Sequence, residues 1–244
     1  MVSGILYGLG VGPGDPELLT LKAKAILEQV PVLAVPVSQR GEESLALQVV
    51  RPFTRPDQEI MNLFMPMTRD RNYLERAWDA AAAELLTVLV AGRDVAFLTL
   101  GDASLYSTYS YLMERLQRLK PDLQIVTVPG ITSFAAAAAR LNVPLAVGDE
   151  PLAIIPALKD PAVLKEYLTL FPNLVLMKVA RRYDAIVSVL EEAGVAGPGV
   201  AGQAYLASRC GCPGESYSRD ITAEKGKKQD YLSLIIVKRA VGAS

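Results

Sequence analysis

The chain has 244 residues, of which 51% are hydrophobic and 21% charged, which is enough apolar material for one large or two small packed domains. Its net charge is -1, so no global field favours binding to nucleic acid or to an anionic membrane. Histidine is absent, which removes the commonest proton shuttle near neutral pH and the commonest ligand of catalytic zinc.

The two cysteines, Cys210 and Cys212, are separated by one residue, a spacing poorly suited to a structural disulfide and without further metal ligands beside it. We therefore expect two free thiols and no metal site. The segment after Met1 lacks the basic region and long apolar core of an export signal, and no apolar run reaches the length that a bilayer span needs. We expect a cytoplasmic protein with no membrane partner.

Short apolar, β-branched runs alternate with longer segments of helical period, which predicts βα units around largely parallel sheets. The expected fold class is α/β, and the last two strands are candidates for antiparallel pairing. The predicted strands cover residues 5–9, 32–35, 60–64, 95–100, 124–128, 153–155, 174–177, 201–206 and 231–237.

Three helices are predicted with definite ends. Apolar residues recur on one helix face between residues 71 and 92, where Asp70 can cap the start and Gly92 the end. A second helix is expected from about Leu105 to Leu119, because the proline at 121 disfavours helical geometry in the residue before it. A third covers the alanine-rich segment 134–140.

The end of the second helix is the expected domain boundary. It gives an N-terminal α/β domain of residues 1–121 and a C-terminal α/β domain of residues 122–244.

A glycine-rich loop, GLGVGPGD, follows the first predicted strand and precedes a helical segment, so backbone can approach a ligand closely there. The dinucleotide fingerprint fails, because the third glycine position holds Pro13 or Asp15, and no Gly-Lys-Ser/Thr follows for a P-loop. On residue types alone, a tight strand-to-helix turn explains the loop equally well.

Three further strand ends carry polar or sulfur-containing residues. In FLTLGDASLYSTY, Asp102 either positions a ligand group or caps the next helix. In VPGITSFAAAAARL, Thr132 and Ser133 stand at a strand-to-helix junction with free backbone donors. Met177 ends another strand, where it serves as core packing or as a cofactor contact.

Together and in this order, these segments resemble the tetrapyrrole methylase family over essentially the whole chain. The matching stretches are GLGVGPGDPELLTLKA, VAFLTLGDASLYSTYSYL, VPGITSFAAAAARLNVPL, LVLMKVAR and YLSLIIV. LTLGD followed by SLYSTY is most similar to the branch that methylates the C-20 meso carbon of precorrin-2 or of its cobalt-loaded counterpart, on the route to cobalamin. The resemblance implies S-adenosylmethionine as methyl donor and S-adenosylhomocysteine as product.

The resemblance also implies a fold of two α/β domains, the first with a mostly parallel sheet and the second with a mixed one, and a cofactor in the cleft between them. It implies a homodimer. Ala103 departs from the proline common in the family, which loosens the loop but removes no functional atom. Carried onto this chain, the expected cofactor contacts, mostly main-chain, are Pro13, Gly101, Asp102, Leu105, Thr132, Ser133, Met177, Cys210 and Ser233.

Methyl transfer from a sulfonium to carbon is a direct displacement that depends on alignment more than on acid or base strength, so a chain without histidine can perform it. The proton acceptor stays unassigned among Tyr106, Tyr109, Glu215 and solvent. A tetrapyrrole rich in carboxylates needs cations to bind it. The candidate substrate-binding residues are Arg40, Tyr106, Lys178, Arg181, Arg182 and Arg209.

Three other functional hypotheses are compatible with the sequence. The first is another tetrapyrrole methylase, such as a uroporphyrinogen III methyltransferase, or an enzyme of the same fold acting on a protein or RNA. The second is a nicotinamide-dependent oxidoreductase, against which the broken fingerprint at Pro13 argues. The third is a non-catalytic nucleotide-binding α/β module.

Overall fold

The computed structural model describes residues 2–39, 43–156, 158–197, 200 and 203–239. The chain forms two compact units, Met1–Thr132 and Ser133–Ser244. The division falls later than the boundary expected at residue 121, because the strand that follows residue 121 pairs with the first strand of the chain. Sheet pairing, rather than the end of the preceding helix, therefore decides where the first unit ends.

The first unit is built on a five-stranded sheet in the order β3-β2-β4-β1-β5. Every neighbouring pair in it is parallel, as the alternation of strand and helix predicts. Since β1 lies between β4 and β5, the loops that follow these three strands meet at one edge of the sheet. The strands are β1 (Leu6–Gly10), β2 (Val32–Val37), β3 (Glu59–Phe64), β4 (Val95–Thr99) and β5 (Ile125–Val128).

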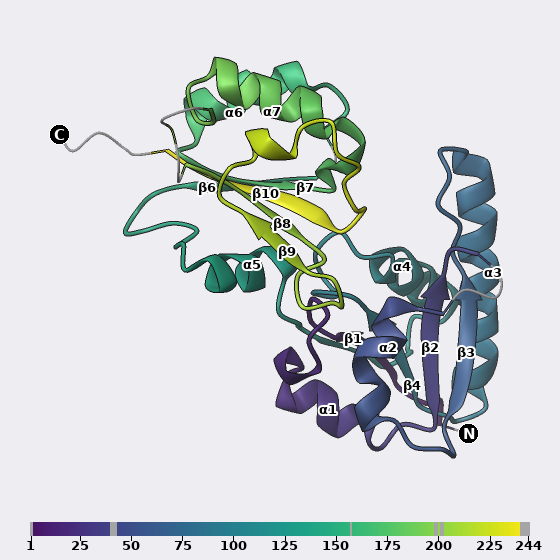
Figure 1. The fold of residues 1–244 in the computed structure, drawn as a ribbon. Coiled ribbons are helices and arrows are strands. Elements are labelled where there is room, and N and C mark those ends of the chain that lie inside the picture. Colours follow the sequence, from purple (N-terminus) through teal and green to yellow (C-terminus); the bar gives the residue numbers. More distant parts are fainter. Residues whose placement is uncertain (1, 40–42, 157, 198–199, 201–202, 240–244) are drawn as a thin grey trace. The chain divides into compact units, whose positions relative to one another are not determined.

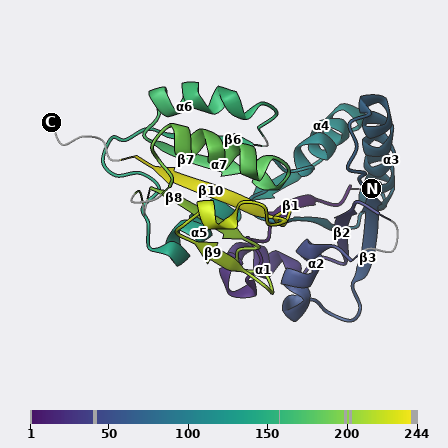
Figure 2. The ribbon, with the colours of Figure 1, turned by 45° about the horizontal axis from the view of Figure 1, so that its top comes forward.

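Helices cover both faces of this sheet (Figure 1). On one face, α1 (Leu21–Leu27) and α2 (Leu45–Val50) pack against the buried side chains that β1, β2 and β4 direct to that face. On the other, α3 (Arg71–Val90) and α4 (Tyr109–Leu119) lie side by side, as Figure 2 also shows. The buried strands are apolar on both sides because both faces are covered.

The ends of α3 follow the prediction closely. The Asp70 carboxylate accepts a hydrogen bond of 3.1 Å from the Tyr73 amide, and Gly92 turns the chain away with a φ of 81°. A carboxylate at the N-cap is the expected signal for the start of a helix, and a left-handed glycine after the last turn is the expected signal for its end.

The second unit is built on a mixed sheet in the order β6-β7-β10-β8-β9, in which only β6 and β7 are parallel. The mixed sheet and the antiparallel pairing of β8 with β10 confirm the sequence prediction. Short, polar β9 was not predicted, and β8 begins at Ala204, while residues 201 and 202 lie outside the described residues. The strands are β6 (Leu152–Pro156), β7 (Asn173–Met177), β8 (Ala204–Ser208), β9 (Ser216–Ser218) and β10 (Ser233–Lys238).

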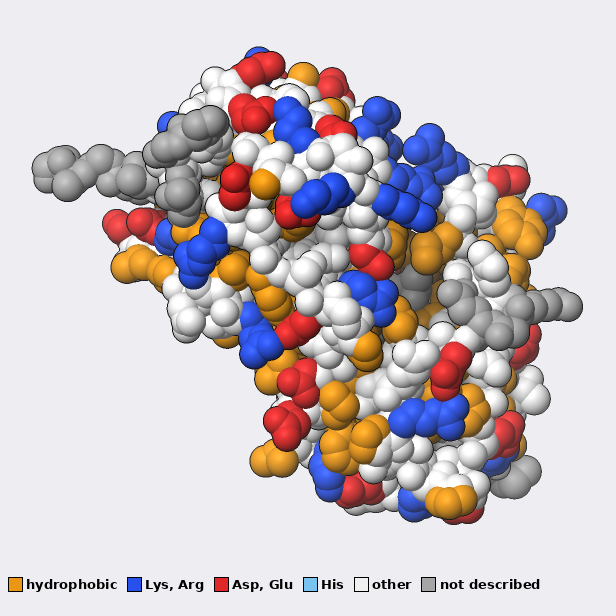
Figure 3. All heavy atoms as spheres, in the orientation of Figure 1, with side chains coloured by type: hydrophobic (Ala, Val, Ile, Leu, Met, Phe, Trp, Pro, Cys, Tyr) orange, Lys and Arg blue, Asp and Glu red, His pale blue; other side chains and the backbone are white. Residues whose placement is uncertain are grey.

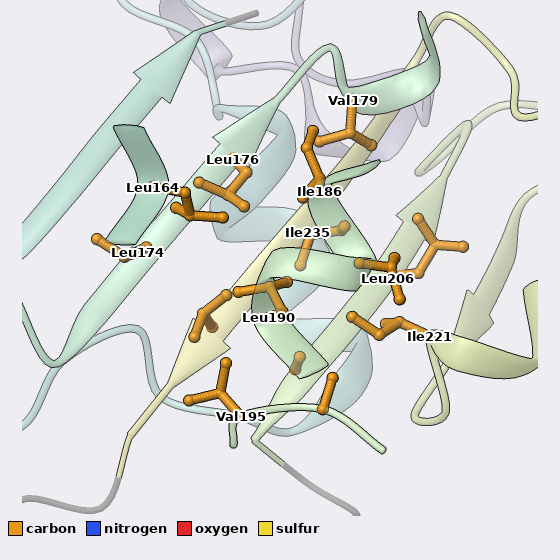
Figure 4. Packing of buried hydrophobic residues seen from close by; sticks show 14 of the residues in the cluster. Leu164, Leu174, Leu176, Val179, Ile186, Leu190, Val195, Leu206, Ile221 and Ile235 are labelled. Carbon is orange, nitrogen blue, oxygen red and sulfur yellow. The ribbon is translucent and has the colours of Figure 1, made fainter. Parts of the chain in front are cut away.

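Three helices sandwich this second sheet (Figure 1). The helices α6 (Leu164–Leu170) and α7 (Tyr183–Glu192) cover one face, and α5 (Ser133–Leu141) lies on the other. Figure 4 shows how Leu190 of α7 packs over Ile235 and its neighbours on adjacent strands. No described helix is long and apolar enough to cross a membrane.

Candidate functional site

Three loops meet at the carboxyl edge of the first sheet. The Val11 amide donates to the Thr99 carbonyl at 2.9 Å, which prolongs the pairing of β1 with β4 beyond both strands. Gly12 and Gly101 then exchange two backbone hydrogen bonds, of 3.2 and 2.6 Å. Two predicted cofactor contacts therefore lie on neighbouring, hydrogen-bonded segments: Gly101 itself, and Pro13, which is buried and follows Gly12.

Glycines allow these loops to touch. A Cβ added at Gly130, after β5, would lie 2.2 Å from the Gly101 carbonyl oxygen and 2.7 Å from the Gly10 carbonyl. A Cβ at Gly10 would lie 2.6 Å from the Gly130 nitrogen. At Gly101 a Cβ would meet nothing within 4 Å, so the backbone there faces open space. We call Gly10, Gly101 and Gly130 with their loops the glycine cradle.

Asp102 joins two of the loops. Its Oδ1 accepts hydrogen bonds from the Ser104 amide at 2.8 Å and the Ser104 hydroxyl at 2.5 Å, while Oδ2 accepts from the Gly130 amide at 2.8 Å. Burial acts to raise the pKa of this carboxyl, but the hydrogen bonds outweigh burial and hold that pKa below its ordinary value. Asp102 therefore stays ionised and ties the β4 loop to the β5 loop, rather than capping a helix.

The segment after Asp102 corrects one prediction. Helix α4 begins at Tyr109, not near Leu105, because the Asp102 side chain holds a turn and Tyr106 has a left-handed φ of 52°. Leu105 and Tyr106 lie in the loop, where Tyr106 is 46% exposed.

Tyr109, one of the candidate proton acceptors, is buried instead. Its ring packs on Gly8, where an added Cβ would lie 2.1 Å from the ring, and its hydroxyl lies 2.9 Å from the Thr127 hydroxyl. Burial raises the pKa of Tyr109. Tyr109 therefore packs α4 against β1 and β5, and its buried, hydrogen-bonded hydroxyl is poorly placed for proton transfer.

One end of the second sheet gathers three more predicted contacts. Met177 ends β7 and pairs with Leu234, the residue after Ser233, while Ser233 pairs with Ser208 at the end of β8. The Ser233 hydroxyl donates to the Ser208 hydroxyl at 3.1 Å, and both serines are buried. Cys210, two residues further on, is also buried. Antiparallel pairing of β10 with both neighbours brings these residues to one edge.

The remaining two predicted contacts stand at the division between the units. Thr132 is the last residue of the first unit, and Ser133 is the first residue of α5. The expected strand-to-helix junction is therefore present.

The predicted cations fall into two groups. Lys178 follows β7 with a left-handed φ of 57°, and Arg181 and Arg182 are exposed in the turn that leads into α7. Among the described residues no carboxylate pairs with these three. Figure 3 shows Lys and Arg side chains gathered where β7 leads into α7.

The other group does not form a free cation cluster. Arg209 donates to the Pro213 carbonyl at 3.0 Å and to Asp230 at 3.1 Å, so its guanidinium is already bound within the protein. Arg40 lies outside the described residues. Within the described part of the chain, no group of three or more Cys, Asp or Glu side chains is arranged to hold a metal ion.

Sequence reasoning missed a side-chain network beside Cys210. Glu215 accepts hydrogen bonds from Arg140 of α5, from the Gly211 amide and from the Tyr217 hydroxyl. The residues of this network lie up to 77 positions apart in the chain, from Arg140 to Tyr217, and no local sequence pattern marks them. Glu215 was singled out from the sequence only as a possible proton acceptor, and Arg140 and Tyr217 were not singled out.

Comparison with known proteins places the chain in a family. Residues 5–224 match the family of Tetrapyrrole (Corrin/Porphyrin) Methylases, and the chain belongs to this family. It is 36% identical over 239 residues to a cobalt-precorrin-2 C(20)-methyltransferase of Salmonella typhimurium, and the match covers 98% of both chains. It is 37% identical over 198 residues to a probable cobalt-precorrin-2 C(20)-methyltransferase of Methanocaldococcus jannaschii, covering 77% of this chain and 82% of the relative.

A solved structure supports the fold. The uroporphyrin-III C-methyltransferase of Thermus thermophilus, in complex with S-adenosylhomocysteine, matches with a TM-score of 0.66 and 23% identity over 96% of this chain and 92% of that one. The α/β fold with one parallel and one mixed sheet is therefore the fold of tetrapyrrole methyltransferases, as predicted.

Proposed function

We propose that this protein transfers a methyl group from S-adenosylmethionine to the C-20 meso carbon of precorrin-2, with the cobalt-loaded form as the preferred substrate. The observation that carries the proposal is the end-to-end similarity to the Salmonella enzyme. The preference for cobalt rests on the names of the two relatives. A cobalt ion would be held by the nitrogens of the macrocycle and needs no ligand from the protein.

The residues present suit S-adenosylmethionine. The open backbone at Gly101 lets a ligand approach without side-chain hindrance, and ionised Asp102 beside it favours a cationic ligand. In the second unit, Met177 and the buried serines offer a thioether and small hydroxyl groups. When bound, S-adenosylmethionine supplies an electrophilic methyl group.

The protein's part in the reaction is to hold the methyl donor and the tetrapyrrole and to orient them toward each other. Alignment of a nucleophile with a leaving group accounts for about 7–11 kcal/mol of a barrier in well-oriented cases. The glycine cradle is suited to this task because its loops are fixed to one another by backbone hydrogen bonds. Tyr109 is packed away and Glu215 is saturated with donors, so exposed Tyr106 and solvent remain as acceptors for the C-20 proton.

Lys178 and Arg181 are proposed to bind substrate carboxylates. Both stand in the turn after β7, and neither is neutralised by a described carboxylate. Replacing both by alanine is expected to raise the KM for the tetrapyrrole about tenfold or more, with kcat little changed, because the cations bind substrate before and during transfer. An unchanged KM in steady-state kinetics would remove them from the site.

The first experiment is isothermal titration of the purified protein with S-adenosylhomocysteine. Methylation assays then follow with metal-free and cobalt-loaded precorrin-2 and with uroporphyrinogen III. Binding together with C-20 methylation supports the proposal. Turnover of uroporphyrinogen III alone would assign the chain to that other activity of the family, and absence of binding by folded protein would favour a non-catalytic module.

We also propose that the protein works as a homodimer in the cytoplasm. The family resemblance supports the dimer, and Cys210 and Cys212, which are both buried and form no disulfide, are compatible with a reducing compartment. Sedimentation equilibrium at micromolar concentration tests the first point, and a monomer would contradict it.

A further inference from the structure

The loop that joins β8 to β9, residues Arg209–Glu215, has an unusual backbone. Arg209 adopts a left-handed φ of 53°, and Gly211 and Gly214 have φ values of 75° and 80°. For a residue with a side chain, such as Arg209, this conformation costs roughly 1–2 kcal/mol. The loop keeps this shape only because its surroundings impose it. We call this segment the cysteine loop.

The Glu215 carboxylate imposes part of that shape. Its Oε2 accepts hydrogen bonds from the Gly211 amide at 2.8 Å and from the Tyr217 hydroxyl at 2.9 Å, and its Oε1 accepts one from Arg140. The hydrogen bond from Gly211, followed by that from Arg140, lowers the pKa of Glu215. The group therefore remains an anion that ties the end of the loop back to Gly211, whereas a general base needs a raised pKa.

Tyr217 connects this carboxylate to Cys210. Its hydroxyl lies 3.2 Å from the Cys210 Sγ and 2.9 Å from Glu215, and it has a single proton to donate. Burial raises the pKa of Cys210, so the sulfur is a neutral thiol and the carboxylate is the stronger acceptor. When Tyr217 donates to the carboxylate, the Cys210 thiol can donate to the Tyr217 oxygen, so the orientation of Cys210 depends on Tyr217 and that of Tyr217 on Glu215.

Arginines link the loop to α5. Arg140 lies near the end of α5, contacts Glu215 and has its guanidinium 6.0 Å from the centre of the Tyr217 ring. Arg219, just after β9, donates to the Leu141 carbonyl at 2.5 Å. The C-terminal end of α5 and the hairpin that carries Cys210 are therefore held together at two points.

We infer that Arg140, Glu215 and Tyr217 are positioning residues, which set the backbone of the cysteine loop for contact with S-adenosylmethionine and hold the C-terminal end of α5 beside it. The inference rests on the proposed function and adds three residues that do not themselves touch the cofactor. Their effect is expected on cofactor binding rather than on the chemical step, since the network holds a binding surface and transfers no proton.

Two variants test the inference, Tyr217→Phe and Glu215→Gln. Loss of a hydrogen bond to a charged group is expected to raise the Kd for S-adenosylhomocysteine about tenfold in each, and to raise the KM for S-adenosylmethionine in parallel. We expect the kcat and its pH profile to stay as in the unchanged protein. If Glu215→Gln does not fold, Tyr217→Phe still decides, because it removes one hydroxyl and keeps the ring.

The matched control is Glu191→Gln, which breaks the 2.8 Å ion pair of Glu191 with Lys225 in the same unit but away from the cysteine loop. It should leave the Kd unchanged. Folded variants that bind S-adenosylhomocysteine as tightly as the unchanged protein would overturn the inference while the proposed function stands. If Glu215→Gln loses one limb of the pH profile of kcat, the inference is also overturned, because Glu215 would then act as a general base. If the unchanged protein fails to bind, the proposed function itself fails.

Discussion

The two strand ends that carry the predicted cofactor contacts are held by different means. In the first unit, the glycine cradle is held mainly by contacts between backbone segments. Gly10 and Gly130 leave no room for a side chain, whereas Gly101 faces open space. In the second, Arg209 is bent into a left-handed conformation, and side chains from α5 and β9 hold the loop. A main-chain cradle tolerates few substitutions, whereas a side-chain network can be weakened in steps.

The sharpest test of this contrast is Gly130→Ala. The new Cβ would overlap the Gly101 and Gly10 carbonyl groups, which are backbone and cannot rotate away. We expect the free energy of unfolding to fall by about 3 kcal/mol, as for severe overpacking, measured by urea denaturation. Gly101→Ala is the control: its Cβ has space, and only the φ of 76° is unfavourable, for a cost of about 1 kcal/mol. Equal losses in both variants would show that close approach is not what the glycines provide.

Asp102→Asn tests the one side chain on which the cradle relies. We expect a loss of about 1–2 kcal/mol at pH 7, because an amide replaces a carboxylate that accepts from Ser104 and Gly130. The pKa of Asp102 is lowered in the folded state, so its contribution is present above the unfolded pKa of about 3.9 and is lost as pH falls through the folded value. The difference in unfolding free energy between the two proteins should therefore shrink below about pH 4. A difference independent of pH from 7 to 3 would contradict this account.

The smallest expected effect concerns Lys178. Its left-handed backbone favours glycine, so Lys178→Gly should raise the free energy of unfolding by about 0.5–1 kcal/mol, less the entropy that glycine loses on folding. Lys178→Ala keeps the strain and should leave stability unchanged, while both variants lose the ammonium group. Thermal unfolding separates the two. If glycine gives no gain in stability, the strain at Lys178 is relieved in some other way.

Much of the first unit was predictable from local sequence. The strand ends near Gly10, Thr99 and Val128 and the caps of α3 lay within a residue or two of their predicted places, because apolar runs and capping residues act over short distances. The start of α4 was wrong, since the turn at Asp102 depends on an amide 28 positions away. Leu105 and Tyr106 were helical by pattern and are loop residues in the structure.

By itself, the sequence determined the alternation of strands and helices, the glycine positions at which backbone could approach backbone, and the motifs that place the chain among tetrapyrrole methylases. Only the tertiary structure decided that β5 belongs to the first sheet, that Tyr109 is buried, and that Arg140, Glu215 and Tyr217 act on one loop. The physical reason is the range of the interactions: propensity and capping are local in the chain, whereas sheet pairing, burial and ion pairing join residues that meet only after the chain has folded.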